Sequence, residues 1–263
     1  MGETELIEKI ASILFKAERE AFEVDRMVDR YPELTSDLAY RIQNRVVELR
    51  SQAENSRISG RKLGLTSVAK QQMMGVDEPL YGVLLDRMLL PEESPISLKA
   101  FIHPKIEPEL AFVFKREIKG PAASVAEVLD ATAYVMPALE IIDSRYRNFS
   151  FTLLDVIADN ASSAGYILGG PCYKPERLDL RLMGMVFKKN GRILSTSTGA
   201  AVMGHPARAI AWMANKLAEN GQSIRPGEVV LSGALCEATS IAPGDEITVS
   251  LDGLGKASAV FTD

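Results

Sequence analysis

Two glutamates separated by one residue lie inside a strand-like apolar run, and this pair constrains the fold more than any other feature. The run covers residues 103–114 and reads HPKIEPELAFVF. Side chains two residues apart on a strand share one face, so Glu107 and Glu109 should point the same way. Such a pair indicates either a cation held between the two charges or the wet face of an edge strand. Pro108, which removes one ladder donor, is compatible with the edge strand.

A third glutamate favours the cation. Glu140 lies near the end of an apolar run at residues 134–142, where an ionised side chain is costly unless it is paired. Glu107, Glu109 and Glu140 on neighbouring strands would offer the carboxylate oxygens that Mg²⁺ or Mn²⁺ prefers. The spacing alone leaves the alternative open, because pairs of acids are common on solvated surfaces.

Composition restricts the classes of partner. The chain has 263 residues, 46% hydrophobic and 25% charged, as in an ordinary globular protein. Its net charge of -5 gives no general reason to bind nucleic acid or an anionic membrane, and no apolar run is long enough to cross a bilayer. Cys172 and Cys236 have no CxxC spacing, and no leader pattern precedes them. We therefore expect reduced, buried thiols and a cytoplasmic protein.

Periodicity predicts a helical amino-terminal part followed by a strand-rich remainder. We expect helices at residues 4–22, 38–49, 68–74, 124–133 and 206–219. We expect strands at residues 83–90, 96–101, 103–114, 134–142, 180–188, 193–197, 229–231, 247–251 and 257–261. Without a regular βαβ alternation, this order indicates an α+β fold with a mixed or largely antiparallel sheet. We divide the chain into a helical or mixed region, 1–75, and a larger domain, 76–263.

Other polar residues are open to two interpretations each. Lys62, between Gly60 and Gly64, suits either a ligand's carbonyl or enolate oxygen or a solvent-facing turn. Arg145 and Arg147 suit either bidentate binding of a carboxylate or a solvated loop, and the loop is favoured for Arg147.

Two further segments carry polar groups. Residues 159–163 offer hydroxyls and amides that suit either carboxylate recognition or turn chemistry. The small residues that precede His205 can present backbone N–H groups to an anion. For His205 itself, a structural role at the entry of a helix is favoured over contact with a ligand.

Several short motifs occur in order along the chain. They are GRKLGLTS at 60–67, E-x-E at 107–109, Glu140, DSR at 143–145, ADNAS at 158–162, GEVVLSG at 227–233 and PGD at 243–245. Together, from about Tyr40 to the end, they resemble the fumarylacetoacetate hydrolase superfamily, in its hydratase and decarboxylase branch of catechol meta-cleavage. The resemblance implies a mixed β-roll with a smaller, partly helical amino-terminal region.

The resemblance also implies roles for residues in these motifs. Glu107, Glu109 and Glu140 would hold Mg²⁺ or Mn²⁺, and Lys62 would contact a 2-oxo acid. The substrate-binding residues expected from the same motifs are Ser162, Arg145, Thr66 and Ser67. The expected partners are a small 2-oxo dicarboxylate and the downstream hydratase, and we expect an oligomer.

The turn after the lysine motif separates two reactions. Hydratases of this branch have Pro-Asp-Phe/Tyr-Gly there, and that aspartate is suited to proton transfer. Residues 79–82 of this chain read PLYG, and Leu80 cannot transfer a proton. Leu80 resembles the decarboxylases, which implies loss of CO₂ from 2-oxo-3-hexenedioate.

Two alternatives stay open. One is hydration of 2-hydroxypenta-2,4-dienoate or 2-oxohept-3-ene-1,7-dioate, with Asp77, Glu78 or Asp86 supplying the acid. The other, a non-enzyme, is a metal-free scaffold whose three glutamates are solvated.

Overall fold

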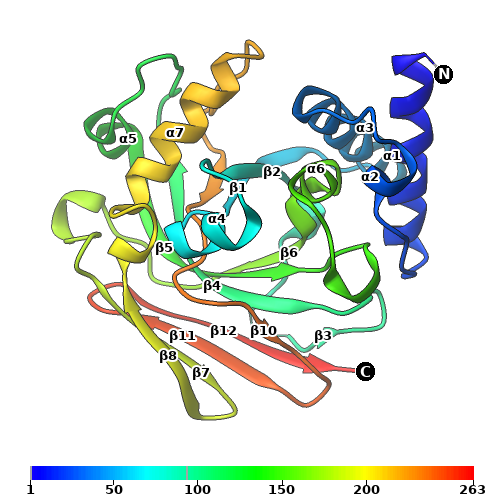
Figure 1. The fold of residues 1–263 in the computed structure, drawn as a ribbon. Coiled ribbons are helices and arrows are strands. Elements are labelled where there is room, and N and C mark those ends of the chain that lie inside the picture. The colour runs from blue at the N-terminus through cyan, green and yellow to red at the C-terminus, as the bar shows by residue number, and fades with distance from the viewer. Residues whose placement is uncertain (1, 93) are drawn as a thin grey trace.

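The computed structural model describes residues 2–92 and 94–263 and contains two curled sheets with helices packed around them (Figure 1). The helices are α1 (Glu3–Arg19), α2 (Met27–Arg30), α3 (Ser36–Glu54), α4 (Val68–Met74), α5 (Val125–Ala131), α6 (Leu153–Ala158) and α7 (Pro206–Ala218). The strands are β1 (Ile58–Gly64), β2 (Leu80–Leu85), β3 (Ile96–Ser97), β4 (Lys105–Phe114), β5 (Thr132–Ile142), β6 (Ser163–Leu168), β7 (Gly184–Lys189), β8 (Arg192–Thr198), β9 (Val229–Leu231), β10 (Thr239–Ser240), β11 (Glu246–Leu251) and β12 (Gly255–Thr262).

Both sheets are mixed. The larger has the order β2-β1-β9-β4-β5-β6, with β10 also paired to β4, and the smaller has the order β3-β12-β11-β7-β8. The pairs β1–β9 and β12–β3 are parallel, whereas the other ladders are antiparallel. Figure 1 shows α5 and α7 at one side of the larger sheet and α1, α3 and α6 grouped at the other. The predicted α+β fold with a mixed β-roll is confirmed.

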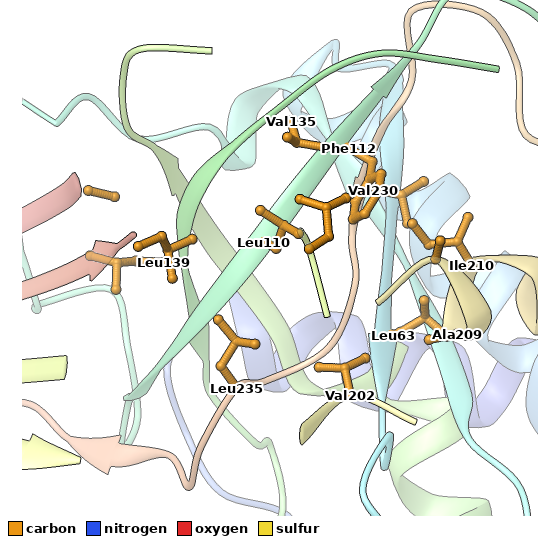
Figure 2. Close-up of a cluster of buried hydrophobic side chains, with 14 of the residues drawn as sticks. Leu63, Leu110, Phe112, Val135, Leu139, Val202, Ala209, Ile210, Val230 and Leu235 are labelled. Atoms are coloured by element: carbon orange, nitrogen blue, oxygen red, sulfur yellow. The ribbon is translucent and has the colours of Figure 1, made fainter. Parts of the chain in front are cut away.

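The main core lies between the sheets and α7. Figure 2 shows Ile210 of α7 close to Phe112 and Val230 of the larger sheet, and all three side chains are fully buried. Burial of a side chain of this size contributes about 1.5–3 kcal/mol. The helix starts where His205 Nδ1 accepts a hydrogen bond from Ala207 N, at 3.1 Å, so His205 has the structural role that the sequence favoured.

The amino-terminal helices form a second core with α6 (Figure 1). The helix α3 is capped at its N-terminus, with Thr35 Oγ1 accepting from Leu38 N at 3.3 Å. Asp155 of α6 is buried and accepts hydrogen bonds from Met27 N at 2.8 Å and Val28 N at 3.2 Å. This carboxylate therefore joins the first turn of α2 to α6 across more than a hundred residues of sequence.

Some predicted elements differ from the observed ones. The strand expected at 96–101 is only β3, because the chain turns where Phe101 N donates to Leu98 O at 3.1 Å. The strand expected at 180–188 begins at Gly184. Five helices and strands were not predicted at all: α2, β1, α6, β6 and β10.

The strand β1 was not predicted because its residues include glycines and charged side chains. Gly60 lies so close to β9 that a Cβ atom would come within 1.9 Å of Val229 O, so glycine is required there for packing rather than for a turn. Although β1 lies before residue 75, it is part of the larger sheet. The division into residues 1–75 and 76–263 stays a prediction.

The cysteines are both free, but their expected burial is wrong for Cys172, which is exposed, and incomplete for Cys236. Within the described residues, no helix combines the length and apolar character needed to span a membrane.

Candidate metal centre and active site

The three glutamates meet on one face of the larger sheet. Glu107 of β4 lies directly opposite Glu140 of β5 in the antiparallel register, and Glu109 follows two residues along β4. One oxygen from each carboxylate can be chosen so that all three lie within 4.8 Å of one another. The exposed fractions are 7% for Glu107 and 0% for both Glu109 and Glu140. The solvated edge-strand interpretation is therefore wrong.

Pro108 is accommodated inside this central strand. The segment 105–106 of β4 pairs with β10 and the segment 111–113 pairs with β9, so the proline falls between the two ladders. Its carbonyl still accepts a hydrogen bond from Leu235 N at 2.9 Å. The missing N–H thus costs no ladder bond on that side.

The donor set fits a hard divalent cation. Gly233 N donates to Glu109 Oε2 at 2.7 Å, but Glu109 Oε1 and both oxygens of Glu140 have no aligned hydrogen-bond donor among the described residues. Buried oxygens without donors are unfavourable. Carboxylate oxygens clustered in this way are the ligands that Mg²⁺ and Mn²⁺ prefer.

The charges at this centre are not balanced without a cation. Burial, followed by the charges of Glu140 and Glu107, raises the pKa of Glu109 well above its ordinary value. Burial also raises the pKa of Glu140 to about 7, although the ammonium of Lys62 opposes the shift. Burial alone would raise the pKa of Glu107 as well, but Lys70 and Lys62 outweigh it and hold that pKa low.

Lys62 is part of the same centre, so the solvent-facing turn is the wrong interpretation for this residue. It lies on β1, is 2% exposed, and places Nζ 3.1 Å from Glu140 Oε1 and 3.1 Å from Ala161 O. Its neighbour Gly82 on β2 has no room for a side chain, because a Cβ atom there would lie 2.7 Å from Asn160 O and 3.1 Å from Lys62 Cδ. The ammonium is thus held on the face that carries the glutamates.

The carbonyl that holds Lys62 belongs to a strained loop. Asn160, Ala161 and Ser162 all have positive φ, at 49°, 55° and 56°, a conformation that costs about 1–2 kcal/mol for each non-glycine residue. The Asn160 side chain compensates by accepting from Val83 N at 2.8 Å and donating to Val83 O at 2.9 Å. The sequence offered only the tolerance of asparagine for this conformation as a signal.

A cavity of about 730 Å³ opens beside this centre. Its polar wall includes Lys62 and Glu107, and Leu80, Thr66 and Ser162 also line it, as expected for residues placed at the substrate. Apolar walls come from Leu65, Ile142, Phe149, Phe151 and Val156. Ser162 Oγ is buried without a hydrogen-bond partner among the described residues, which leaves this hydroxyl available to a ligand.

Two predicted substrate residues lie elsewhere. Ser67 does not line the cavity, and its hydroxyl caps α4 by accepting from Lys70 N at 3.2 Å. The guanidinium of Arg145 is buried against the Asp159 side chain and donates to the Asp143 carbonyl at 2.7 Å. Its position supports the loop that contains Asn160. Arg147, as favoured, is exposed and pairs with Asp25 at 3.1 Å.

Sequence reasoning missed several residues of the site. Lys70 Nζ lies 2.8 Å from Glu107 Oε1, and Lys105 and Phe149 line the cavity together. Gly233 has a φ of 108°, and a Cβ there would lie 2.3 Å from Thr66 Oγ1. A lysine on a short helix and a glycine after a strand carry no signal of such contacts until the fold brings them together.

Comparisons with known proteins agree with this geometry. Residues 51–262 match the family described as fumarylacetoacetate (FAA) hydrolase C-terminal. The chain is 43% identical to a 4-oxalocrotonate decarboxylase of Pseudomonas putida over 252 residues, which cover 96% of this chain and 95% of that protein. It is 37% identical to a 2-hydroxyhexa-2,4-dienoate hydratase of Comamonas testosteroni, with 100% of both chains covered.

A solved structure gives the same result. The 4-oxalocrotonate decarboxylase from Pseudomonas putida G7, complexed with magnesium and adipate, superposes with a TM-score of 0.95 and 41% identity, covering 98% of each chain. The match extends through the amino-terminal helices as well as the sheets. This chain belongs to the fumarylacetoacetate hydrolase family.

Proposed function

We propose that this chain is a decarboxylase dependent on Mg²⁺ or Mn²⁺ that converts 2-oxo-3-hexenedioate (4-oxalocrotonate) into 2-hydroxypenta-2,4-dienoate and CO₂ in catechol meta-cleavage. The observation that carries the proposal is the buried cluster of Glu107, Glu109 and Glu140, with Lys62 beside it, next to a cavity in which Leu80 replaces an acid. The 43% identity to a 4-oxalocrotonate decarboxylase, against 37% to a hydratase, supports the same choice.

Each side chain has a defined task in this reaction. A bound divalent cation supplies Lewis-acid polarisation of the 2-oxo group, and the three glutamates are the residues that would hold it. When the bond between C5 and C6 breaks, its electron pair moves through the conjugated chain to the 2-oxo oxygen. Lys62 Nζ can donate a hydrogen bond to that oxygen, which then takes up a proton to give the dienol.

The apolar wall favours loss of CO₂ over addition of water. Leu80 is 2% exposed and lines the cavity, where it cannot donate or accept a proton. Asp77, Glu78 and Asp86, the acids considered for a hydratase, are absent from the described lining of this cavity. At the position of Leu80, where the hydratase motif has an aspartate, the cavity therefore offers no group that can transfer a proton.

Other residues position the substrate or its neighbours. We infer that Thr66 and Ser162 contact the substrate carboxylate or 2-oxo group, because both line the cavity and the Ser162 hydroxyl lacks another partner among the described residues. Arg145, buried with Asp159, would act as a positioning residue for the loop that holds Lys62. We also propose a cytoplasmic location, an oligomer, and a complex with the hydratase that consumes the product.

The hydratase alternative is tested with the variant Leu80→Asp and two substrates. The wild type should release CO₂ from 2-oxo-3-hexenedioate and should not hydrate 2-hydroxypenta-2,4-dienoate. The Leu80→Asp variant should lose decarboxylation while it keeps its metal affinity. Hydration of the dienoate by the wild type, without CO₂ release above the spontaneous rate, would contradict the proposal.

The scaffold alternative is tested by calorimetric titration with Mn²⁺. We expect one site per chain that disappears in Glu109→Ala. A titration without that site would instead support a metal-free scaffold.

A further inference from the structure

The proposed substrate has a second carboxylate, and the cavity must neutralise it. Three lysines line the cavity: Lys62, Lys70 and Lys105. Glu237 adds a negative charge to the same wall, so a dianion needs a compensating cation there. Arg145 is not available, because its guanidinium is buried against Asp159.

Two of the three lysines already have carboxylate partners. Lys62 Nζ lies 3.1 Å from Glu140 Oε1, and Lys70 Nζ lies 2.8 Å from Glu107 Oε1. Both ammonium groups therefore belong to the metal end of the cavity. Their charges are already offset by these carboxylates, so the far end of the substrate gains less from either of them than from an ammonium without a carboxylate partner.

Lys105 is the lysine that has no such partner. Within residues 2–92 and 94–263, its ammonium forms no ion pair, and it lies 4.0 Å from the centre of the Phe149 ring. Phe149 lines the cavity as well. A cation–π contact of this kind restricts the lysine side chain and leaves its N–H groups free to bind an anion.

The register of β4 places Lys105 at a useful distance from the metal centre. Lys105, Glu107 and Glu109 lie two residues apart along β4, so their side chains point to the same face of the strand. Two residues of strand span about 7 Å. Four bonds separate the 2-oxo carbon of the substrate from its distal carboxylate carbon, which is a comparable span when the chain is extended.

We propose that Lys105, held against the ring of Phe149, binds the distal carboxylate and makes the cavity selective for 2-oxo dicarboxylates over 2-oxo monocarboxylates. This inference rests on the proposed function, because it assumes that the 2-oxo end of the ligand lies at the three glutamates. It assigns Lys105 to specificity and leaves the chemical step to the metal end.

The test measures binding without turnover. The Mn²⁺-loaded protein is titrated by calorimetry with 2-oxoadipate and with 2-oxohexanoate, which differ in the distal carboxylate and lack the double bond that the reaction needs. The wild type should prefer 2-oxoadipate by about tenfold or more, as expected for a charged hydrogen bond. Lys105→Met should lose this preference, with unchanged affinities for Mn²⁺ and 2-oxohexanoate, and Lys105→Arg should restore it.

A matched control and a competing residue complete the experiment. Lys99→Met removes an exposed lysine and should leave the preference intact. The inference is overturned if Lys105→Met keeps the preference, or if Lys70→Met loses it while Lys105→Met does not. Failure of the proposed function would appear separately, as a wild type that releases no CO₂, whatever the two ligands show.

Discussion

Three buried carboxylates within 4.8 Å of one another define the chemistry of this molecule at the scale of single residues. Burial, and after it the repulsion between the carboxylates, opposes ionisation, which is why the pKa of Glu140 is raised to about 7 and that of Glu109 is raised as well. A divalent cation reverses this balance, because it binds only the ionised forms.

Metal affinity should therefore increase with pH. Burial raises the pKa of Glu140 to about 7 and that of Glu109 well above its ordinary value, and any proton that these carboxylates hold in the metal-free chain must leave when metal binds. Between pH 6 and 8, we expect the dissociation constant for Mn²⁺ to fall by up to about tenfold per pH unit for each proton released. Calorimetry in buffers of different ionisation enthalpy counts the protons. An affinity that is constant over this range, with no proton release, would contradict the assignment of these carboxylates as ligands.

At this scale, the sequence predicted the glutamates and Lys62 but not Lys70. Alternation along a strand placed Glu107 and Glu109 on one face, and the cost of burying Glu140 in an apolar run suggested a shared partner. The sequence did not indicate Lys70 as a site residue, because its contact with Glu107, at 2.8 Å, depends on how α4 folds back over the sheet. Arg145 was expected at the substrate because a sequence does not reveal that Asp159 occupies its guanidinium.

At the scale of elements, Asp155 holds the amino-terminal helices to the body. Its side chain accepts from Met27 N and Val28 N of α2, and also from Thr152 N at 2.9 Å and Thr152 Oγ1 at 2.8 Å at the start of α6. One buried carboxylate thus satisfies the first turns of two helices. The loop that holds Lys62 follows directly after α6.

Replacement of this carboxylate should destabilise the whole chain. We expect Asp155→Ala to lower the free energy of unfolding by about 2–4 kcal/mol, because several buried N–H and O–H donors lose their acceptor. Urea denaturation followed by circular dichroism measures the change. Asp37→Ala, which removes an exposed aspartate whose partner is Arg41 at 3.5 Å, is the control and should change stability by less than about 1 kcal/mol. Equal effects of the two substitutions would contradict this role of Asp155.

Elements with a clear period were predictable, whereas those with compensating tertiary contacts were not. The apolar residues of β4, β5, β11 and β12 gave their approximate positions. In contrast, Gly60 interrupts the strand pattern of β1, although this glycine is required because β1 lies close to Val229. Residues 160–162 have positive φ, and the sequence indicated this segment only as a turn. In the structure, the turn directs the Ala161 carbonyl to Lys62.

At the scale of the whole molecule, the metal centre lies on the central strands β4 and β5 of the larger sheet. A ligand that binds only the folded state stabilises the entire chain. Because the three glutamates come from two strands whose pairing exists only after folding, the unfolded chain cannot offer the same site.

Bound metal should consequently raise the melting temperature. At a Mn²⁺ concentration a hundred times the dissociation constant, the gain is about 2.7 kcal/mol, which corresponds to a shift of roughly 5–10 °C for a chain of this size. Differential scanning calorimetry measures the shift. Glu109→Ala should show none, whereas Glu33→Ala, at an exposed position, should respond as the wild type does. A metal-induced shift in Glu109→Ala equal to that of the wild type would place the metal elsewhere.

The most direct test is the stoichiometry of the products that the intact chain forms from 2-oxo-3-hexenedioate in the presence of Mg²⁺. CO₂ is measured in the gas phase, and the organic product is identified by proton NMR in the same reaction. We predict one CO₂ for each 2-hydroxypenta-2,4-dienoate, a rate that EDTA abolishes, and no hydrated dicarboxylate. A hydrated six-carbon product without CO₂, or CO₂ release that EDTA does not affect, would contradict metal-dependent decarboxylation.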